Sequence, residues 1–292
     1  MKSIETLVED IQNVFQLPHE FAPERAERFG QRLATLVKTK IEEDSSGWQP
    51  RLRMSNLGTK CDRKLWYSIH EAANRWPIEV SARIKFLYGD ILEQLLLFLA
   101  EEAGHTVAGC QDLVEIDGVR GRRDAIIDGV LVDVKSAATQ SFKKFEQGLT
   151  YAEDDFGYLD QLFAYLEACQ DDPRLVDKNR AAFLVIGKEL GHIVLDVHNR
   201  PDISYRTMVS VKRGVTNQAS PPPRRYEDEP EGASGNRKLS TVCSYCDWRH
   251  VCWPELRAFA YSNKPSYLTR VVREPKVPEF SLPNVTKSKG AA

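Results

Sequence analysis

Two Asp-Gly dipeptides between short alternating runs constrain the fold of this 292-residue chain more than any other feature. They begin at Asp117 and at Asp128, and each connects two runs rich in β-branched and aliphatic residues. Asp-Gly in this setting is the strongest short-range signal for a two-residue β-hairpin turn, because both residues tolerate a positive φ. We therefore predict three consecutive antiparallel strands. These strands are 113–116, 119–127 and 130–137.

The neighbouring segments supply helices and further strands for a layered structure. The three-four spacing of apolar residues over 84–103 predicts a long, well-buried helix that ends at Gly104. A second helix is expected at 156–168, followed by a strand pair at 182–186 and 192–197. Together these elements predict an α/β or α+β core with a mixed, mostly buried central sheet flanked by helices.

The ends of the chain and one internal stretch have sequence patterns that differ from those of this core. The first fifty residues predict two amphipathic helices, a helical cap or docking surface, with Pro23 in the first turn of the second. Prolines and acidic residues predict a flexible linker and an extended tail. The expected segments are 1–50 (N-terminal helical region), 51–214 (core), 215–238 (linker), 239–263 (cysteine module) and 264–292 (tail).

Composition excludes two broad classes. With 42% hydrophobic and 28% charged residues, the chain is neither a disordered nor a membrane protein, so we expect no membrane partner. The start Met-Lys-Ser-Ile-Glu-Thr lacks the features of a leader, and we expect a cytoplasmic location. Forty basic and forty-two acidic residues give a net charge of −2, so any polyanion would be held by local patches.

Counting outward from the second Asp-Gly turn places Asp124 opposite Asp133. Carboxylates about 5 Å apart repel by about 3 kcal/mol at an effective dielectric of about 20. An apolar sheet would not tolerate that pair unneutralised. Either one carboxyl keeps its proton or a cation lies between the two.

Strand alternation adds Lys135 to the same face as Asp133, while Val134 points away into the core. Hard oxygen ligands select Mg²⁺ or Mn²⁺, and a nearby lysine can orient or deprotonate a water. This constellation suits phosphodiester hydrolysis. The alternative is a surface hairpin whose charges are solvated.

The same residues resemble a known family. Gly121-Arg122-Arg123-Asp124, followed after eight residues by Asp133-Val134-Lys135-Ser136, resembles the core motif of PD-(D/E)XK nucleases. The resemblance implies a restriction-endonuclease-like core in which Lys135 positions or activates water. It also implies that the metal ligands are Asp124, Asp133 and the carbonyl of Val134.

Two helices extend the resemblance. Gln161 and Tyr165 share a helix face and resemble the Gln-x-x-x-Tyr motif of RecB-type nucleases, where it lines the DNA path. Glu93 follows Gly89 at the position where RecB-type members usually have histidine, a departure that resembles phage recombination exonucleases and implies a third carboxylate ligand. In isolation, each could instead be a polar group on a solvated helix face.

Four of the six cysteines form a second pattern. Cys243, Cys246 and Cys252 lie within ten residues, and Cys61 lies far upstream in a cation-rich segment. Four thiolates suit Zn²⁺ or an iron-sulfur cluster, so spacing alone leaves the metal open. The order resembles the iron-sulfur staple of CRISPR-associated RecB-like exonucleases, which implies a 4Fe-4S cluster rather than zinc. The alternative is reduced cysteines without metal, and we read Cys110 and Cys169 as buried small hydrophobes.

Cations and aromatic rings flank these cysteines and suit single-stranded nucleic acid, although any of the rings could belong to the core. Three arginines of the predicted strand 119–127 could add phosphate contacts. The candidates are Lys60, Arg63, Lys64, Trp66, Tyr67, Arg120, Arg122, Arg123, Trp248, Arg249, His250 and Trp253.

These observations predict a Mg²⁺- or Mn²⁺-dependent DNA nuclease, an exonuclease acting on single-stranded DNA or single-stranded ends. Recombination, repair, or phage and CRISPR DNA processing would fit, with protein partners from those processes. One alternative is a catalytically inactive DNA-binding accessory protein with the same fold and cluster. Another is a structural protein held by zinc.

Overall fold

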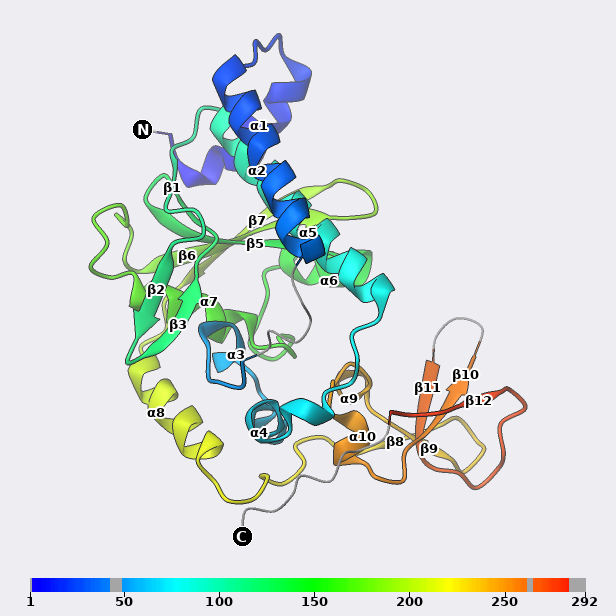
Figure 1. Ribbon diagram of the computed structural model, residues 1–292. Helices are drawn as coiled ribbons and strands as arrows, with labels where there is room; N and C mark the ends of the chain where they lie inside the picture. The colour runs from blue at the N-terminus through cyan, green and yellow to red at the C-terminus, as the bar shows by residue number, and fades with distance from the viewer. Residues whose placement is uncertain (1, 43–48, 262–264, 284–292) are drawn as a thin grey trace. The chain divides into compact units, whose positions relative to one another are not determined.

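The computed structural model describes residues 2–42, 49–261 and 265–283, shown in Figure 1. The chain forms two compact units. The first comprises Met1–Gly47, Arg53–Gly58 and Glu79–Ser210, and the second comprises Trp48–Leu52, Thr59–Ile78 and Val211–Ala292. Within the described part of the chain, no helix is long and apolar enough to cross a membrane.

The first unit is built on a five-stranded sheet in the order β1-β4-β5-β6-β7, beside a separate β2-β3 hairpin. The β5-β6 pair is parallel and the other pairs are antiparallel, which confirms the predicted mixed sheet. Its strands are β1 (Val107–Ala108), β2 (Leu113–Ile116), β3 (Val119–Arg122), β4 (Ala125–Ile127), β5 (Val130–Ala137), β6 (Arg180–Gly187) and β7 (Ile193–Asn199). Its helices are η1 (Ile4–Thr6), α1 (Leu7–Gln16), α2 (Pro23–Glu42), α3 (Met54–Leu57), α5 (Val80–Glu102), α6 (Thr139–Glu146), α7 (Tyr158–Ala168) and the start of α8 (Tyr205–Thr216).

Both predicted hairpin turns are confirmed. The pair Ile127 and Val130 closes the second hairpin, and Asp128 and Gly129 between them have φ values of 48° and 83°. The first turn repeats this geometry, with φ values of 46° at Asp117 and 78° at its glycine. Two consecutive positive φ angles define the type I′ turn, which matches the right-handed twist of its strands.

The predicted continuous strand over 119–127 is wrong, because the chain leaves the ladder at Arg123 and Asp124. The side chain of Arg123 is 2% exposed and donates to the carbonyl of Gly109. Its backbone N–H donates to the carbonyl of Asp112 rather than to a neighbouring strand. The break divides the run between two sheets and places Asp124 just ahead of β4.

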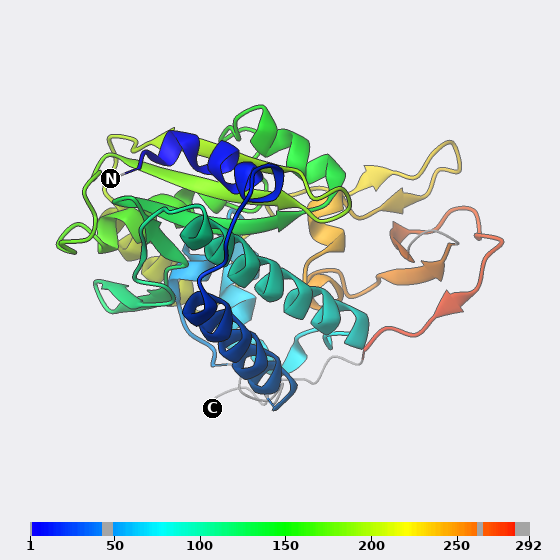
Figure 2. The same ribbon diagram turned by 90° about the horizontal axis from the view of Figure 1, so that it is seen from above.

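The core between α1, α5 and one face of the sheet contains Val132, Val134 and Leu184. Helix α5 runs beside α2 (Figures 1 and 2) and ends at Glu102, ahead of Gly104 with φ 84°. The prediction of a well-buried helix holds only for its second half. Residues on its first half are exposed, among them Val80, Ile84, Phe86 and Tyr88.

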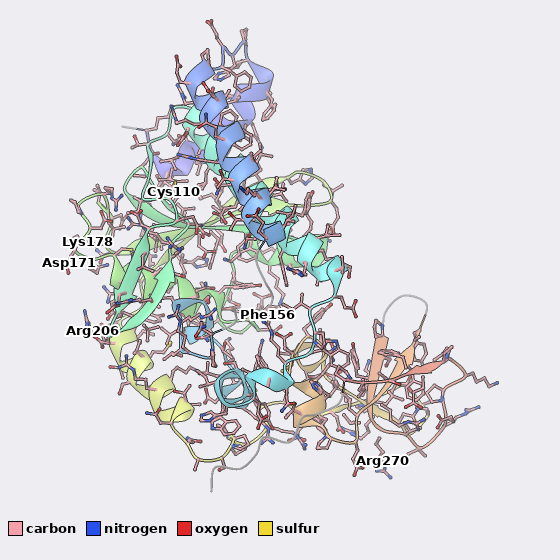
Figure 3. The ribbon with its side chains drawn as sticks, in the orientation of Figure 1. Cys110, Phe156, Asp171, Lys178, Arg206 and Arg270 are labelled. Atoms are coloured by element: carbon pink, nitrogen blue, oxygen red, sulfur yellow. The ribbon has the colours of Figure 1, made fainter. Side chains whose placement is uncertain are left out.

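The N-terminal helices and α7 form close to their predicted positions. Helix α2 begins at Pro23, as expected, and α1 buries Leu7 and Ile11. Helix α7 begins two residues later than predicted, because Asp154 accepts hydrogen bonds from three successive N–H groups at its start. Phe156, labelled in Figure 3, lies in the loop that leads into this helix.

The second unit contains a five-stranded sheet in the order β12-β10-β11-β9-β8, which the sequence patterns do not predict. Two of its strands lie within the predicted linker and two within the predicted tail, so parts of both segments form a sheet. Most of these strands are too short to show an alternating pattern, and the pairs β9-β11 and β10-β12 join strands that are not consecutive in the sequence. The elements are α4 (Asp62–His70), η3 (Ala72–Asn74), β8 (Glu229–Pro230), β9 (Arg237–Lys238), α9 (Thr241–Ser244), α10 (Arg249–Cys252), β10 (Arg257–Ala260), β11 (Pro265–Arg270) and β12 (Glu279–Phe280).

Candidate active site and cysteine pocket

The carboxylate site lies on β5 and on the residue that precedes β4. Asp133 and Lys135 alternate with Val134, whose side chain packs into the core on the other face. The ammonium of Lys135 forms an ion pair with Asp133 Oδ2. The carboxylate of Asp124 accepts a hydrogen bond from the N–H of Val134 at 2.8 Å. The hairpin therefore brings together both aspartates and the lysine of the sequence motif.

Glu93 reaches the same site from α5. Burial, together with the charges of Asp90 and Asp133, raises its pKa to about 7, although the hydrogen bond from Gln111 acts to lower it. Burial likewise holds the pKa of Asp124 well above its ordinary range, with added repulsion from Asp133 and Glu93. As a whole residue Asp124 is only half-buried, but its carboxyl group is dehydrated. The nearby ammonium of Lys135 does not fully neutralise the negative charge of these acids.

At Lys135, burial and the neighbouring charges act on the pKa in opposite directions. Burial alone would lower its pKa, but the charges of Asp133 and Asp124 outweigh burial and raise it above its usual value. The ammonium also lies 5.5 Å from the ring centroid of Tyr158. Lys135 is therefore a firmly charged group, which suits positioning and charge stabilisation better than accepting a proton.

Sequence patterns do not single out Gln111, although it connects two of the acids. Its Nε2 donates to Glu93 Oε1 at 2.8 Å and lies 3.4 Å from Asp124 Oδ1. The residue lies in the loop after β1 with φ 56°, outside any helix or strand. No periodicity marks such a position, so only the folded arrangement reveals it.

Helix α7 places Gln161 and Tyr165 beside the site, and Gln161 hydrogen-bonds the Tyr165 hydroxyl. Burial, followed by the charges of Asp133 and Asp124, raises the pKa of Tyr165. Position 121 of the motif has no room for a side chain, because a Cβ there would lie 2.5 Å from the Tyr165 hydroxyl. The Gln-x-x-x-Tyr helix is thus fixed close to the carboxylates.

The carboxyl groups of Asp124, Asp133 and Glu93 are oxygen ligands of the kind that divalent cations prefer. Asp133 Oδ2 is buried, and the partner found for it is the ammonium of Lys135. Three carboxyl groups, two of them with raised pKa values, face one ammonium. Within residues 2–42, 49–261 and 265–283, no three His, Cys, Asp or Glu side chains are arranged so that they could hold a metal ion as they stand.

The second unit brings the four predicted cysteines together. Cys61 at the start of α4 lines one pocket with Cys243, Cys246 and Cys252, and their thiols carry no disulfide. Burial raises the pKa of the Cys246 thiol to about 12, so this thiol is protonated at neutral pH. Four thiols are a donor set that suits a metal cluster, but among the described residues they are not arranged so that they could hold a metal ion as they stand.

The other two cysteines lie in the first unit. Cys169 is buried as predicted, but its sulfur accepts a hydrogen bond from Arg123 at 3.3 Å, so it is more than a small hydrophobe. Cys110, in the loop that follows β1 (Figure 3), is partly buried against the core. Neither belongs to the pocket.

Several predicted nucleic-acid contacts prove to be structural. Arg249 is buried between the rings of Trp76 and Tyr267, 3.6 and 4.5 Å from their centroids, and cannot meet a phosphate there. Arg123 is likewise buried, with its guanidinium against Asp172 at 2.6 Å. The rings of Trp66, Tyr67 and Trp248 form a small core, and His250 is also buried. Lys64 is half-buried near Cys246.

A mixed sheet that carries an Asp-x-Lys triplet on one strand, with a further acid just ahead of the neighbouring strand, is the arrangement of a class of metal-dependent phosphodiesterases. The sequence profile of the PD-(D/E)XK nuclease superfamily matches residues 10–253, and the chain belongs to this superfamily. Membership implies a nuclease acting on DNA, and such nucleases typically use Mg²⁺ or Mn²⁺. No curated protein matches the chain significantly. Among solved structures, the crystal structure of SSO0001 is 17% identical with a TM-score of 0.40, covering 78% of this chain and 95% of that one.

Proposed function

We propose that the protein hydrolyses DNA phosphodiester bonds with Mg²⁺ or Mn²⁺ held by Asp124, Asp133, Glu93 and the carbonyl of Val134. The observation that carries this proposal is the incomplete neutralisation of the buried acids, seen in the raised pKa values of Glu93 and Asp124. A divalent cation would remove that repulsion, and when bound it supplies Lewis-acid stabilisation of charge on the phosphate.

Within this proposal Lys135 orients the attacking water and stabilises negative charge. Its raised pKa supports a charged role, because a general base must spend part of its time unprotonated near neutral pH. Gln161 and Tyr165 would steer the strand toward the carboxylates from α7. Tyr158 would hold the ammonium in place through its ring face.

We further propose that the enzyme is an exonuclease acting on single-stranded DNA ends, in recombination, repair, or phage or CRISPR DNA processing. The support is the resemblance of its motifs and the order of its cysteines. Incubation with end-labelled single and double strands, with Mg²⁺, Mn²⁺ or a chelator, tests this directly. Mononucleotide or short products from the ends, only with metal, are expected. Binding without cleavage would favour the inactive accessory protein.

Replacement of Lys135 by Ala separates metal binding from chemistry. We expect cleavage to fall by about 10²–10⁴-fold, the usual contribution of a proton-handling or water-positioning group, while metal binding persists. Calorimetric titration with Mn²⁺ and single-turnover cleavage measure the two quantities. Full cleavage by this variant, with contaminating nucleases excluded, would contradict the assignment of Lys135.

The cysteine pocket is proposed to hold a 4Fe-4S cluster through Cys61, Cys243, Cys246 and Cys252. Its support is that residues from two distant segments line one pocket and that Lys64 and Arg224 lie close enough to influence the thiols. Protein purified without oxygen is expected to be brown and to contain about four irons per chain. A colourless protein with one zinc per chain would replace the cluster with a structural zinc site.

A further inference from the structure

Gln111 makes a bridge that none of the sequence motifs describes. One amide nitrogen contacts a carboxylate oxygen of Glu93 at 2.8 Å and one of Asp124 at 3.4 Å. The two acids come from α5 and from the chain just ahead of β4, so the bridge connects separate elements. An amide nitrogen has two N–H donors, enough to serve both acids from one atom.

The backbone of residue 111 is fixed by the same neighbourhood. Its N–H donates to the carbonyl of Asp124 at 3.2 Å, and its own carbonyl accepts from Arg122 Nη1 at 2.8 Å. The residue therefore cannot move away from Asp124 without breaking several contacts. An amide at this position neither adds charge nor titrates, in contrast to a histidine or lysine.

We infer that Gln111 is a positioning residue that holds Glu93 and Asp124 together as one ligand pair. The inference rests on the proposed function, in which both acids bind the divalent cation. Each acid gives one oxygen to the amide, Oε1 of Glu93 and Oδ1 of Asp124. The second oxygen of Asp124 accepts from the Val134 N–H and has one further lone pair that it could give to a cation. Since groups that orient metal ligands typically contribute 10–100-fold to affinity, the effect is measurable.

The test uses the full-length protein and Mn²⁺ binding, followed by electron paramagnetic resonance and by calorimetry. Gln111→Asn is the variant of choice, because Asn keeps the amide, withdraws it by one methylene and tolerates the positive φ. Gln111→Gly is the second variant, should the first fold poorly. We expect both to bind Mn²⁺ about tenfold more weakly.

Gln94 provides the matched control. Its amide lies 3.4 Å from the same Glu93 oxygen, but no contact with Asp124 is recorded for it in the described chain. If bridging is what matters, Gln94→Ala should leave Mn²⁺ affinity within about twofold of the parent. An equal loss in the Gln94 and Gln111 variants would overturn the inference, because any hydrogen bond to Glu93 would then suffice.

A second comparison places Gln111→Asn in a Glu93→Gln background. If Gln111 acts by pairing the two acids, its substitution should weaken Mn²⁺ binding little in that background. An undiminished tenfold loss there, or parental affinity in Gln111→Asn alone, would overturn the inference and leave the nuclease proposal intact. If the parent protein binds no Mn²⁺ and cleaves no DNA, the proposed function fails, and the inference fails with it.

Discussion

The carboxylate site and the cysteine pocket are assembled in opposite ways. Asp124, Asp133 and Lys135 lie within twelve residues on and beside one hairpin, so strand geometry fixes their directions. The cysteines come from α4 and from the short segments around α9 and α10, and Cys61 lies 182 positions before Cys243. The first site is built by local pairing and the second by long-range closure.

This contrast leads to different consequences of losing metal. The hairpin keeps its hydrogen bonds without any ion, and metal removal at the carboxylates should affect chemistry rather than folding. At the pocket, a ligand shared by distant segments would restrict the unfolded chain, so its removal should affect stability.

Asp133→Asn should abolish metal-dependent cleavage while the fold survives. The loss of one anionic ligand removes several kcal/mol of transition-state stabilisation, roughly a 10³-fold lower rate or more. The backbone of residue 133 still pairs with Phe183 in the sheet. Single-turnover cleavage and circular dichroism measure the two effects, with the exposed Asp202→Asn as control. Unchanged cleavage in Asp133→Asn would remove this residue from the active site.

Cys61→Ser should have the larger effect on stability. A lost cross-link typically costs about 2–5 kcal/mol, and about 2 kcal/mol would lower Tm by roughly 4–8 °C in a domain of this size. Iron content should fall at the same time, whereas Cys110→Ser, outside the pocket, should keep both colour and Tm. Cys61→Ser protein with its full iron content would show that the fourth ligand is another residue.

The predictability of the two sites follows from the same contrast. The hairpin register and the direction of Lys135 could be counted from the Asp-Gly turn, because strand pairing has a period of two. The break at Arg123 could not be predicted, since its cause is a buried guanidinium that forms ion pairs with Asp112 and Asp172. An arginine within an alternating run reads as exposed unless its partners are known.

Gln111 and the second sheet escaped prediction for a related reason. Gln111 acts from a loop through contacts to two other elements, which leave no mark in the sequence around it. The strands β8 to β12 are two to six residues long, and the pairs β9-β11 and β10-β12 join strands that are not consecutive in the sequence. Arg249 shows the same limit, because the rings that bury it come from Trp76 and Tyr267, far from it in sequence.

Asp124→Asn should stabilise the metal-free protein in a pH-dependent way. The folded state holds the Asp124 proton more tightly than the unfolded chain does, so ionisation of this carboxyl costs stability as pH rises above its unfolded pKa. Asn removes that cost and can still accept the hydrogen bond from Val134. We expect a small gain in the free energy of unfolding at pH 8 and almost none near pH 4.

Urea unfolding of chelator-treated protein at these two pH values measures the effect. Asp202→Asn again serves as the control, because an exposed carboxyl should change stability equally little at both. A variant that is less stable than the parent at pH 8 would indicate that Asp124 is held by favourable contacts and that its repulsion is unimportant.

Lys64→Ala and Arg249→Ala should separate DNA contact from structural packing in the second unit, with the smallest effect of the series. Lys64 is half-buried, whereas Arg249 lies between two rings. If Lys64 meets a phosphate, its loss should reduce the slope of log affinity against log salt by about 0.7 for a single strand. Arg249→Ala should lower Tm and leave that slope unchanged in the folded protein, because a buried cation releases no counterions from DNA. Fluorescence anisotropy at several salt concentrations measures both slopes. An unchanged slope in Lys64→Ala would mean that the DNA strand does not contact Lys64. A reduced slope in folded Arg249→Ala would mean that Arg249 leaves the rings of Trp76 and Tyr267 when DNA binds.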